Sequence, residues 1–549
     1  MDTGEYDVLV LGAGPNGLTC AAYLARAGAR VMVLEKRFEI GGTLSTDDYS
    51  TPFHFNIAQA TVPVGPASPA FADLGLSALG VRFLEPEVAA AFVPADGARS
   101  LVVHRGGAEL GGDIAEALRA AKRTLVPLFY APPVESERVA EAVSATGGQA
   151  LLDIAGMTPN QLATSVDDDR ASGLLRYLCA VSGFLATDEP LGLVGAWTVL
   201  QQLEPTLVKG GSKSLALGLY RASVAAGAEY RLVADVVSVQ PQGDRLRVSC
   251  RDGREFLAPA VVSTLDLVTT FRELMPSEAV PSEIAETVER WRLDETGPFT
   301  GHFGIKGSAP APTDLEAEDA FMQVLGFAGD SDVAEAVATV HSGQRTSSPV
   351  GHLTVTTRHD PAQASAGPYG PLHTLRFSTL FPWTPRDPDW AYRRTEHRSA
   401  LWAALLERVP ALGQSRLLFS FADGPPDIEQ RFRTTRNGSI RQGALTTDQT
   451  LTMRPHPSLS RTRTPVPGLY LGGGSVHAGI PGALAGGYHA AAAVCESLGL
   501  TQWWPTPELL ERAREAGDIP DSLLPTPRPS VRVPEQRRRE ARVPLRSRA

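Results

Sequence analysis

The stretch Asp7–Lys36, DVLVLGAGPNGLTCAAYLARAGARVMVLEK, decides the fold of this chain. It begins with a short apolar run, which predicts a buried strand. Gly12, Gly14 and Gly17 follow with the spacing G-x-G-x-x-G, where a strand turns into a helix. The first glycine permits the tight turn, the second lets a diphosphate approach the backbone, and the third lets the helix pack on the strand. The sequence therefore predicts an α/β fold with a Rossmann-type dinucleotide site.

The end of the next strand narrows the choice of dinucleotide. Residues 31–34 predict a second strand, and Glu35 ends it about 20 residues past the glycines, where an acid accepts hydrogen bonds from the adenosine ribose. A carboxylate there disfavours the 2′-phosphate of NADP, so FAD or NAD is expected. The helix N-terminus, near Pro15, offers free N–H groups to the diphosphate. The expected cofactor contacts of this unit are Gly12, Gly14, Pro15, Asn16, Gly17, Glu35 and Lys36.

A second glycine pair, Gly41-Gly42 followed by Thr43, comes directly after the acid. The combined pattern resembles the N-terminal signature of the phytoene desaturase/dehydrogenase-like FAD-dependent oxidoreductases, within the amine oxidase superfamily. In that signature G-x-G-x-x-G, an acid and G-G-x-x-[ST] occur in this order. The resemblance implies FAD as the cofactor and contacts to it from Gly41, Gly42 and Thr43.

A second stretch also predicts a strand, a glycine turn and a helix in this order. It spans residues 465–494, PVPGLYLGGGSVHAGIPGALAGGYHAAAAV. It resembles the C-terminal signature of the same family, roughly G-L-Y-L-x-G-x-x-[ST]-H-P-G-G-G, which closes over the flavin ring. This sequence departs from the pattern at Ala478, Ile480 and Pro481. The resemblance implies flavin contacts from Gly473, Gly474, Ser475 and Ile480.

Two blocks between these ends resemble the family as well. Residues 232–239 and 260–264 resemble strands of the FAD domain, in which the residue matching Val236 meets adenine through its backbone. The run from Asp448-Gln449 to Arg454-Pro455 resembles the β-carotene ketolase-like branch. Relatives in that branch often carry a histidine upstream of this run, where Gln442 stands here.

The resemblance implies a discontinuous Rossmann-type FAD-binding domain into which a mixed α+β substrate domain is inserted. Residues 299–305 and 372–380 alternate or run apolar, which predicts sheet strands in the insert. The expected division is 1–75, 205–270 and 445–500 for the FAD-binding domain, 76–204 and 271–444 for the substrate-binding domain, and 501–549 for a C-terminal segment with a disordered basic tail.

The amino-acid composition limits which binding partners and which cellular location are expected. The 549 residues are 43% hydrophobic and 20% charged, which is ordinary for a globular protein, and no apolar run is long enough to span a membrane. The N-terminus carries no basic signal region, so a cytoplasmic location is expected. The four cysteines lack a C-x-x-C spacing, so no metal site is expected. The whole chain has a formal net charge of −10, and this acidic balance disfavours nucleic-acid binding.

The C-terminal end has a different charge from the body. Residues 525–549 contain eight Arg and two Glu among many prolines, which predicts a solvated tail. Docking to an anionic surface or to an acidic partner subunit is the alternative, and peripheral membrane contact stays open. Trp503-Trp504 predicts packing of this segment onto the body, with contact to a membrane surface as the alternative.

The flavin of such an enzyme performs the redox chemistry, and the protein binds, orients and excludes water. His477 is the candidate catalytic acid or base. The alternative is a loop histidine held by backbone carbonyls. Arg454 is a candidate electrostatic partner of flavin or substrate, or else the partner of a carboxylate in the FAD domain.

We therefore expect an FAD-dependent oxidoreductase of the phytoene dehydrogenase type. It would transfer hydride to or from a lipophilic conjugated polyene in carotenoid or natural-product biosynthesis, by desaturation or by reduction coupled to ring closure. NAD(P)H and O2 are both open as redox partners. The expected substrate cavity is apolar with few polar groups. Carotenoid ketolase, flavin amine oxidase and a non-catalytic flavin-binding protein are the alternatives.

Overall fold

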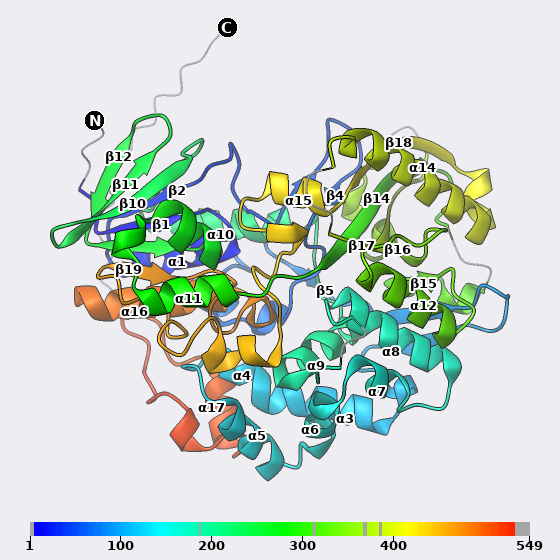
Figure 1. Cartoon of the computed structure of the whole chain (residues 1–549), viewed down its shortest axis with the longest axis horizontal. Helices are drawn as coiled ribbons and strands as arrows, with labels where there is room; N and C mark the ends of the chain where they lie inside the picture. Colours follow the sequence, from blue (N-terminus) through cyan, green and yellow to red (C-terminus); the bar gives the residue numbers. More distant parts are fainter. Residues whose placement is uncertain (1–4, 186–187, 311–313, 366–369, 384–386, 533–549) are drawn as a thin grey trace, which may run out of the picture.

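The computed structural model describes residues 5–532 except 186–187, 311–313, 366–369 and 384–386. Two lobes lie side by side above a layer of helices (Figure 1). The lobe at the left contains the N-terminal βαβ unit, and the lobe at the right contains a large sheet. This architecture confirms the expected fold class, a Rossmann-type domain with an inserted mixed α+β domain.

The first lobe is built on a five-stranded parallel sheet. Its order is β19 (Leu469–Leu471), β13 (Ala260–Ser263), β1 (Val8–Leu11), β2 (Val31–Leu34) and β9 (Glu229–Arg231). The strands come from three separate stretches of the chain and every neighbouring pair is parallel. Because the cofactor-binding edge of such a sheet is the carboxyl end of its strands, the fold brings residues near 12, 35, 264 and 472 to one edge.

Both faces of this sheet are covered, which explains why β1 is apolar throughout. Val8 and Val10 pack among the helices α1 (Pro15–Arg26), α10 (Lys213–Ala225) and α16 (Ala485–Leu498). Leu9 and Leu11 face an antiparallel sheet and α11 on the other side. These elements are β10 (Val236–Gln242), β11 (Arg245–Cys250), β12 (Glu255–Ala258) and α11 (Ser282–Arg290).

The core of the first lobe extends beyond two of the expected segments. Phe271, Ile284 and Trp291 share the core of β1 and β13, although they follow residue 270. Leu76 and Val81 share the core of α1 and α10, beyond residue 75. Helix α2 (Pro69–Asp73) and the short pair β5 (Phe83–Leu84) and β8 (Leu207–Val208) complete this region.

The second lobe contains a seven-stranded sheet. Its order is β18 (Arg416–Asp423), β14 (Thr296–Lys306), β17 (Leu372–Pro382), β16 (Gly351–Val355), β15 (Met322–Leu325), β6 (Val88–Val93) and β7 (Leu101–His104). Only the β15–β6 pair is parallel among these described strands. The expected strands at 299–305 and 372–380 lie within β14 and β17.

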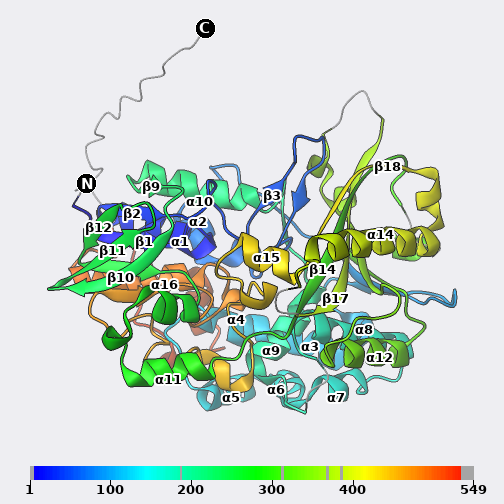
Figure 2. The ribbon, with the colours of Figure 1, turned by 45° about the horizontal axis from the view of Figure 1, so that its top comes forward.

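The two faces of this sheet differ in polarity. Phe299, Phe303 and Phe377 pack under α14 (Trp390–Arg408), which covers one face (Figure 2). Since side chains alternate along a strand, the neighbouring positions point to the opposite face. There the strands carry polar side chains and face α8 (Asp169–Val181) and α9 (Gly192–Leu200) across a cavity.

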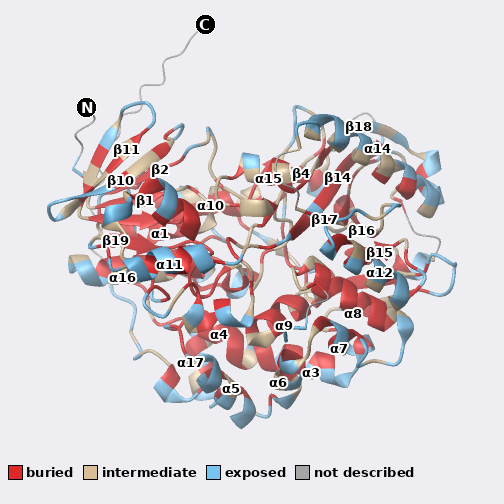
Figure 3. Ribbon diagram, viewed as in Figure 1, coloured by how far each residue is buried: buried red, intermediate tan, exposed pale blue. Residues whose placement is uncertain are grey.

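The helical layer joins the lobes and holds the largest apolar core (Figure 3). It contains α3 (Gly112–Ala120), α4 (Val126–Leu128), α5 (Ser136–Ala145), α6 (Gln149–Gly156), α7 (Pro159–Ala163), α12 (Asp330–His341) and α17 (Glu508–Glu515). The remaining short elements are α13 (Thr356–His359), α15 (Pro425–Arg431), β3 (Thr46–Asp47) and β4 (Phe55–Asn56). No helix in the described part has the length and hydropathy needed to cross a bilayer.

The C-terminal segment packs on the first lobe. Trp503 and Trp504 are buried against Tyr23, and the indole Nε1 of Trp503 donates to the carbonyl of Tyr23 over 3.1 Å. Packing, not membrane contact, is therefore the role of this pair. The expectation of a free tail from residue 525 is wrong for its first part, because Arg528 forms two hydrogen bonds with Thr506 and Val531 bonds the carbonyl of Trp503. Residues 533–549 lie outside the described part.

Candidate active site

A cavity of about 520 Å³ lies at the carboxyl ends of β1 and β2. This is where a doubly wound sheet binds its ligand. Of the expected cofactor contacts, its lining includes Gly12, Gly14, Pro15, Asn16, Glu35, Lys36, Gly42, Thr43, Val236, Gly474 and Ile480. The two glycine motifs, more than 400 residues apart, thus meet at one cavity, and the backbone N–H of Gly487 in α16 donates to Oδ1 of Asn16 over 3.2 Å.

The three glycines of the first motif have three different roles. Gly12 has φ +95°, a conformation that other residues rarely adopt. A Cβ on Gly14 would meet nothing within 4 Å, so the backbone there faces open space that a diphosphate can fill. A Cβ on Gly17 would lie 2.0 Å from the carbonyl oxygen of Gly12, so Gly17 permits the helix to pack and does not line the cavity.

Glu35 is held by the glycine turn. Its Oε2 accepts from the backbone N–H of Ala13 over 2.7 Å, and its Oε1 accepts from the N–H of Arg37 over 2.9 Å. Burial raises the pKa of this carboxyl, and the two N–H donors oppose that shift. The carboxylate therefore joins β2 to the turn after β1 while its side chain lines the cavity where a ribose is expected.

Three expected contacts, Gly41, Gly473 and Ser475, lie just behind the lining. The N–H of Gly41 donates to the carbonyl of Ala13 over 2.8 Å. A Cβ on Gly473 would lie 2.6 Å from the carbonyl oxygen of Thr264, so only glycine fits against the end of β13. The hydroxyl of Ser475 donates to the carbonyl of Gln442 over 3.1 Å. These residues shape the cavity and do not face it.

Gln442 itself lines the cavity, although the sequence suggested no role for it. Its Oε1 accepts from the N–H of Gly474 over 2.5 Å, and its Nε2 donates to the carbonyl of Thr264 over 3.2 Å. The amide thus ties the second glycine loop to the end of β13. An uncharged side chain stands here where relatives in the ketolase-like branch often carry histidine.

Arg454 contacts no carboxylate among the described residues and lines neither cavity, contrary to both expectations for it. Its guanidinium donates to five backbone carbonyls, including those of Arg441 and Gly474 at 2.8 Å each. Burial lowers its pKa to about 10, so it stays charged at neutral pH. The side chain therefore fastens the second glycine loop to the segment before it.

His477 is buried and lines neither cavity. Its Nε2 lies 3.1 Å from the carbonyl oxygen of Leu128, and Nδ1 has no partner among the described residues. Burial, with His489 nearby, lowers its pKa to about 3, so the ring is neutral. This placement matches the alternative of a loop histidine held by a carbonyl, and it gives no contact through which His477 could exchange a proton with a ligand.

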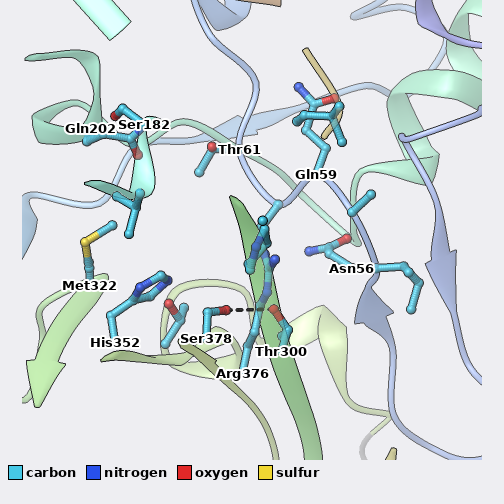
Figure 4. Close-up of a pocket in the computed structure, with 18 of the residues that line it drawn as sticks. Asn56, Gln59, Thr61, Ser182, Gln202, Thr300, Met322, His352, Arg376 and Ser378 are labelled. Carbon is cyan, nitrogen blue, oxygen red and sulfur yellow. Dashed lines mark hydrogen bonds between the residues drawn. The ribbon is translucent and has the colours of Figure 1, made fainter. Parts of the chain in front are cut away.

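A second cavity, of about 260 Å³, lies between the seven-stranded sheet and helices α8 and α9 (Figure 4). Gln59, Ile440 and Ile480 line both cavities, so the two spaces meet at these three side chains. Phe55, Ile57, Val181, Leu207, Met322 and Leu445 contribute apolar surface to the second cavity. Its position beside the expected flavin end of the first cavity makes it the candidate substrate cavity.

The wall formed by the sheet is polar, which differs from the expected apolar lining. Ser378 and Thr300 hydrogen-bond to each other at 3.0 Å, and the hydroxyl of Tyr177 lies 2.9 Å from Nδ1 of His352. Burial lowers the pKa of His352 to about 3 and lowers that of His302. Both rings are neutral, so they act as hydrogen-bonding groups and carry no charge.

The sequence does contain a signal for this wall. In the run LHTLRFSTL, residues 372–380, the polar Thr374, Arg376 and Ser378 alternate with Leu375 and Phe377. A period of two in a strand places the two sets on opposite faces. The run therefore predicts a strand with one polar face, which a reading for apolar content alone overlooks.

The first cavity fits FAD. Its shape combines the free N-terminus of α1, the open space at Gly14 and the carboxylate of Glu35 in the order that diphosphate and ribose require. Gly474 and Ile480 would face the flavin end. Among the described residues no group of His, Cys, Asp and Glu is close enough together to hold a metal ion.

Residues 16–299 match the family of flavin containing amine oxidoreductases. The chain belongs to this family. A curated relative is a limonene dehydrogenase subunit of Castellaniella defragrans (strain DSM 12143 / CCUG 39792 / 65Phen), 28% identical over 559 residues, 93% of this chain and 98% of the relative. Pyridine nucleotide-disulfide oxidoreductase domain-containing protein 2 of Mus musculus is 26% identical over 86% of this chain and 90% of the relative.

Solved structures of two oxidases share the fold. Wild-type putrescine oxidase bound to putrescine aligns with a TM-score of 0.58 at 16% identity, covering 90% of this chain and all of that one. Cyclohexylamine oxidase from Brevibacterium oxydans IH-35A aligns with a TM-score of 0.57 at 14% identity and the same coverage. The family match identifies the chain as an FAD-dependent oxidoreductase of the amine oxidase superfamily.

Proposed function

We propose that this enzyme is a dehydrogenase of the phytoene dehydrogenase type that acts on a compact, unsaturated lipophile of terpene size. The observation that carries the proposal is the meeting of the cofactor cavity and the second cavity at Ile440, Ile480 and Gln59. The relative from limonene dehydrogenase, which matches nearly the whole chain, supports a terpene-related substrate.

The residues at this junction suit hydride transfer. Bound FAD supplies a ring system that takes up or gives back a hydride. Ile440 and Ile480 exclude water from the contact, and Gln59 is a neutral amide. Ile480 stands where the family pattern usually has glycine, so a bulky apolar side chain narrows the passage at this point.

The size of the second cavity favours a compact substrate. Its volume of about 260 Å³ lies just below the roughly 300–1,000 Å³ range of ligand pockets. A long polyene would extend beyond it. This volume supports a smaller unsaturated molecule over the long conjugated substrate expected from the sequence.

Amine oxidation is the second candidate, because Asp423 places a carboxylate in the wall of the cavity. A cationic amine would also face Arg376, whose guanidinium has no ion-pair partner among the described residues. Repulsion between two cations in a cavity of low polarity disfavours this candidate.

Product analysis tests the proposal. The purified protein, incubated with limonene and an artificial electron acceptor, should yield a product two hydrogen atoms lighter. Ile480→Trp should abolish turnover yet retain FAD, because the larger side chain fills the junction. Leu315→Trp, at an exposed position of the substrate domain, serves as the control and should keep activity. Product from a simple amine and none from any lipophile would refute the proposal.

A further inference from the structure

Arg376 lies in the middle of the polar wall of the second cavity. It is directly opposite His302 on β14 and Thr354 on β16 in the register of the sheet. Its side chain points into the cavity between His352 and Asn56 (Figure 4). The apolar neighbours on its strand, Leu375 and Phe377, are buried in the core under α14 on the other face.

The guanidinium of Arg376 forms no hydrogen bond or ion pair within the described part of the chain, although the carboxylate of Asp423 acts on it electrostatically without direct contact. Its Nε is buried without a hydrogen bond, and no hydrogen bond or ion pair reaches its other nitrogens from any described residue. Burial lowers its pKa to about 10, against the opposing effect of the Asp423 carboxylate, so the group remains a cation at neutral pH. A buried cation without a partner is costly, and proteins rarely retain one.

Other enclosed arginines of this chain are satisfied. Arg176 binds both oxygens of Asp330, at 2.6 and 2.9 Å. Arg454 donates to five carbonyls, and Arg441 pairs with Asp294 at 3.0 Å. Arg376 is the exception among these, and it is the one that faces the middle of the candidate substrate cavity.

The charged groups around Arg376 act on it without direct contact, so its hydrogen-bond donors are free to bind an anion. His302 and His352 flank it and are neutral, since burial lowers the pKa of both. Asp423 lies on β18, two strands away, with Oδ2 3.5 Å from Nε2 of His302, so the imidazole stands between the carboxylate and the guanidinium. The hydroxyls of Ser378 and Thr354 line the same wall and can donate to a bound oxygen.

We propose that Arg376 binds a carboxylate of the substrate, so that the enzyme acts on a compact lipophilic acid in preference to a bare hydrocarbon. This inference rests on the function proposed above. A planar guanidinium binds a carboxylate through two parallel hydrogen bonds. Arg376 does not line the cofactor cavity, so an acid held there presents its other end to the junction at Ile480.

Three compounds with one carbon skeleton test the proposal: perillic acid, its methyl ester and limonene. Each is titrated into the FAD-loaded wild type, and binding is followed by the flavin absorbance. The acid should bind at least about tenfold more tightly than the ester, because a hydrogen-bonded charge pair is worth that much. This comparison needs no mutation and so does not depend on the folding of a variant.

Two variants test whether Arg376 causes the difference in affinity between the acid and the ester. Arg376→Gln should weaken binding of the acid about tenfold or more and leave binding of the ester unchanged, while Arg376→Lys should restore part of the affinity. Arg358→Gln is the matched control, because Arg358 pairs with Glu318 in the same domain and does not line the cavity. It should bind the acid as the wild type does. Flavin content and melting temperature report on folding.

The outcomes separate the two proposals. Equal affinity of the wild type for acid and ester, or an equal loss of both in Arg376→Gln, overturns the carboxylate site and leaves the proposed function standing if limonene or the ester reduces the flavin. No response to any of the three compounds, with reduction of the flavin by a simple amine, overturns both.

Discussion

Nε of Arg454 donates to the carbonyl oxygen of Gly474 over 2.8 Å, in the loop that lines the expected flavin end of the cofactor cavity. The same guanidinium bonds carbonyls of residues 441–449. The loop is thus held in place by an arginine that lines neither cavity.

Replacement of Arg454 should therefore destabilise the cofactor site. Arg454→Met removes the donor of five carbonyls; that of Ala444 keeps Nε2 of Gln449 as a second donor, and each of the others left unsatisfied costs about 1–3 kcal/mol. We expect a loss of more than about 3 kcal/mol in the free energy of unfolding, together with loss of bound FAD. Denaturant unfolding and flavin content measure both effects. Arg463→Gln, at an exposed ion pair with Glu496, should change little, and equal stability of the two variants would contradict this role.

Glu35 should both hold the glycine turn in place and bind the cofactor. Glu35→Ala removes the acceptor of the N–H groups of Ala13 and Arg37 and the expected ribose contact. Affinity for FAD should fall about tenfold or more, since each charge-assisted hydrogen bond contributes about 1.5–3 kcal/mol. Fluorescence titration of the apoprotein with FAD measures this. Glu255→Ala, at an exposed strand position, is the control, and unchanged affinity in Glu35→Ala would exclude the role.

Asp73 predicts a pH dependence of stability. Burial raises the pKa of its carboxyl to about 6, and the hydroxyl of Tyr23 donates to it over 2.6 Å. Because the folded state binds this proton more tightly than the unfolded state, its contribution to stability is lost as pH rises from about 4 to about 6. Asp73→Asn keeps the acceptor without the charge. Between these pH values, the free energy of unfolding of this variant should rise relative to that of the wild type by on the order of 1 kcal/mol. Exposed Asp244→Asn should show no such trend.

The C-terminal segment should stabilise the first lobe up to Arg532. A chain that ends at Leu524 loses the bonds of Arg528 to Thr506 and of Val531 to Trp503. It should be less stable than a chain that ends at Arg532 by about 3 kcal/mol, since each of these three bonds contributes roughly 1 kcal/mol. Melting temperatures of the two truncated proteins measure the difference, and equal values would show that residues 525–532 contribute nothing.

The parts of the fold that depend on local sequence were predictable. The strand, glycine turn and acid of residues 7–36 each leave a short signal, and β1, α1 and β2 lie where that signal places them. The second glycine motif likewise predicted that β19 and α16 reach the cofactor edge. Such motifs can be recognised in a sequence because the close approach of a ligand or another segment to the backbone restricts which residues fit.

The partners of long side chains were not predictable in this way. The acceptors of Arg454 are carbonyls, which carry no residue identity in the sequence. The position of His477 behind Leu128 depends on packing between segments far apart in the sequence. The alternation of residues in β17 predicts its polar face. That this face lines a cavity depends on the packing of α8 and α9 against the sheet, which only the tertiary structure reveals.

Reduction of the bound flavin in the absence of oxygen tests the central claim most directly. The FAD-loaded protein is mixed anaerobically with a compact unsaturated lipophile, a long carotenoid or a simple amine, and the visible absorbance of the flavin is followed. We expect that the compact lipophile bleaches the flavin, that the carotenoid and the amine do not, and that Ile480→Trp prevents the bleaching. Rapid bleaching by the amine, with none by any lipophile, would contradict the central claim.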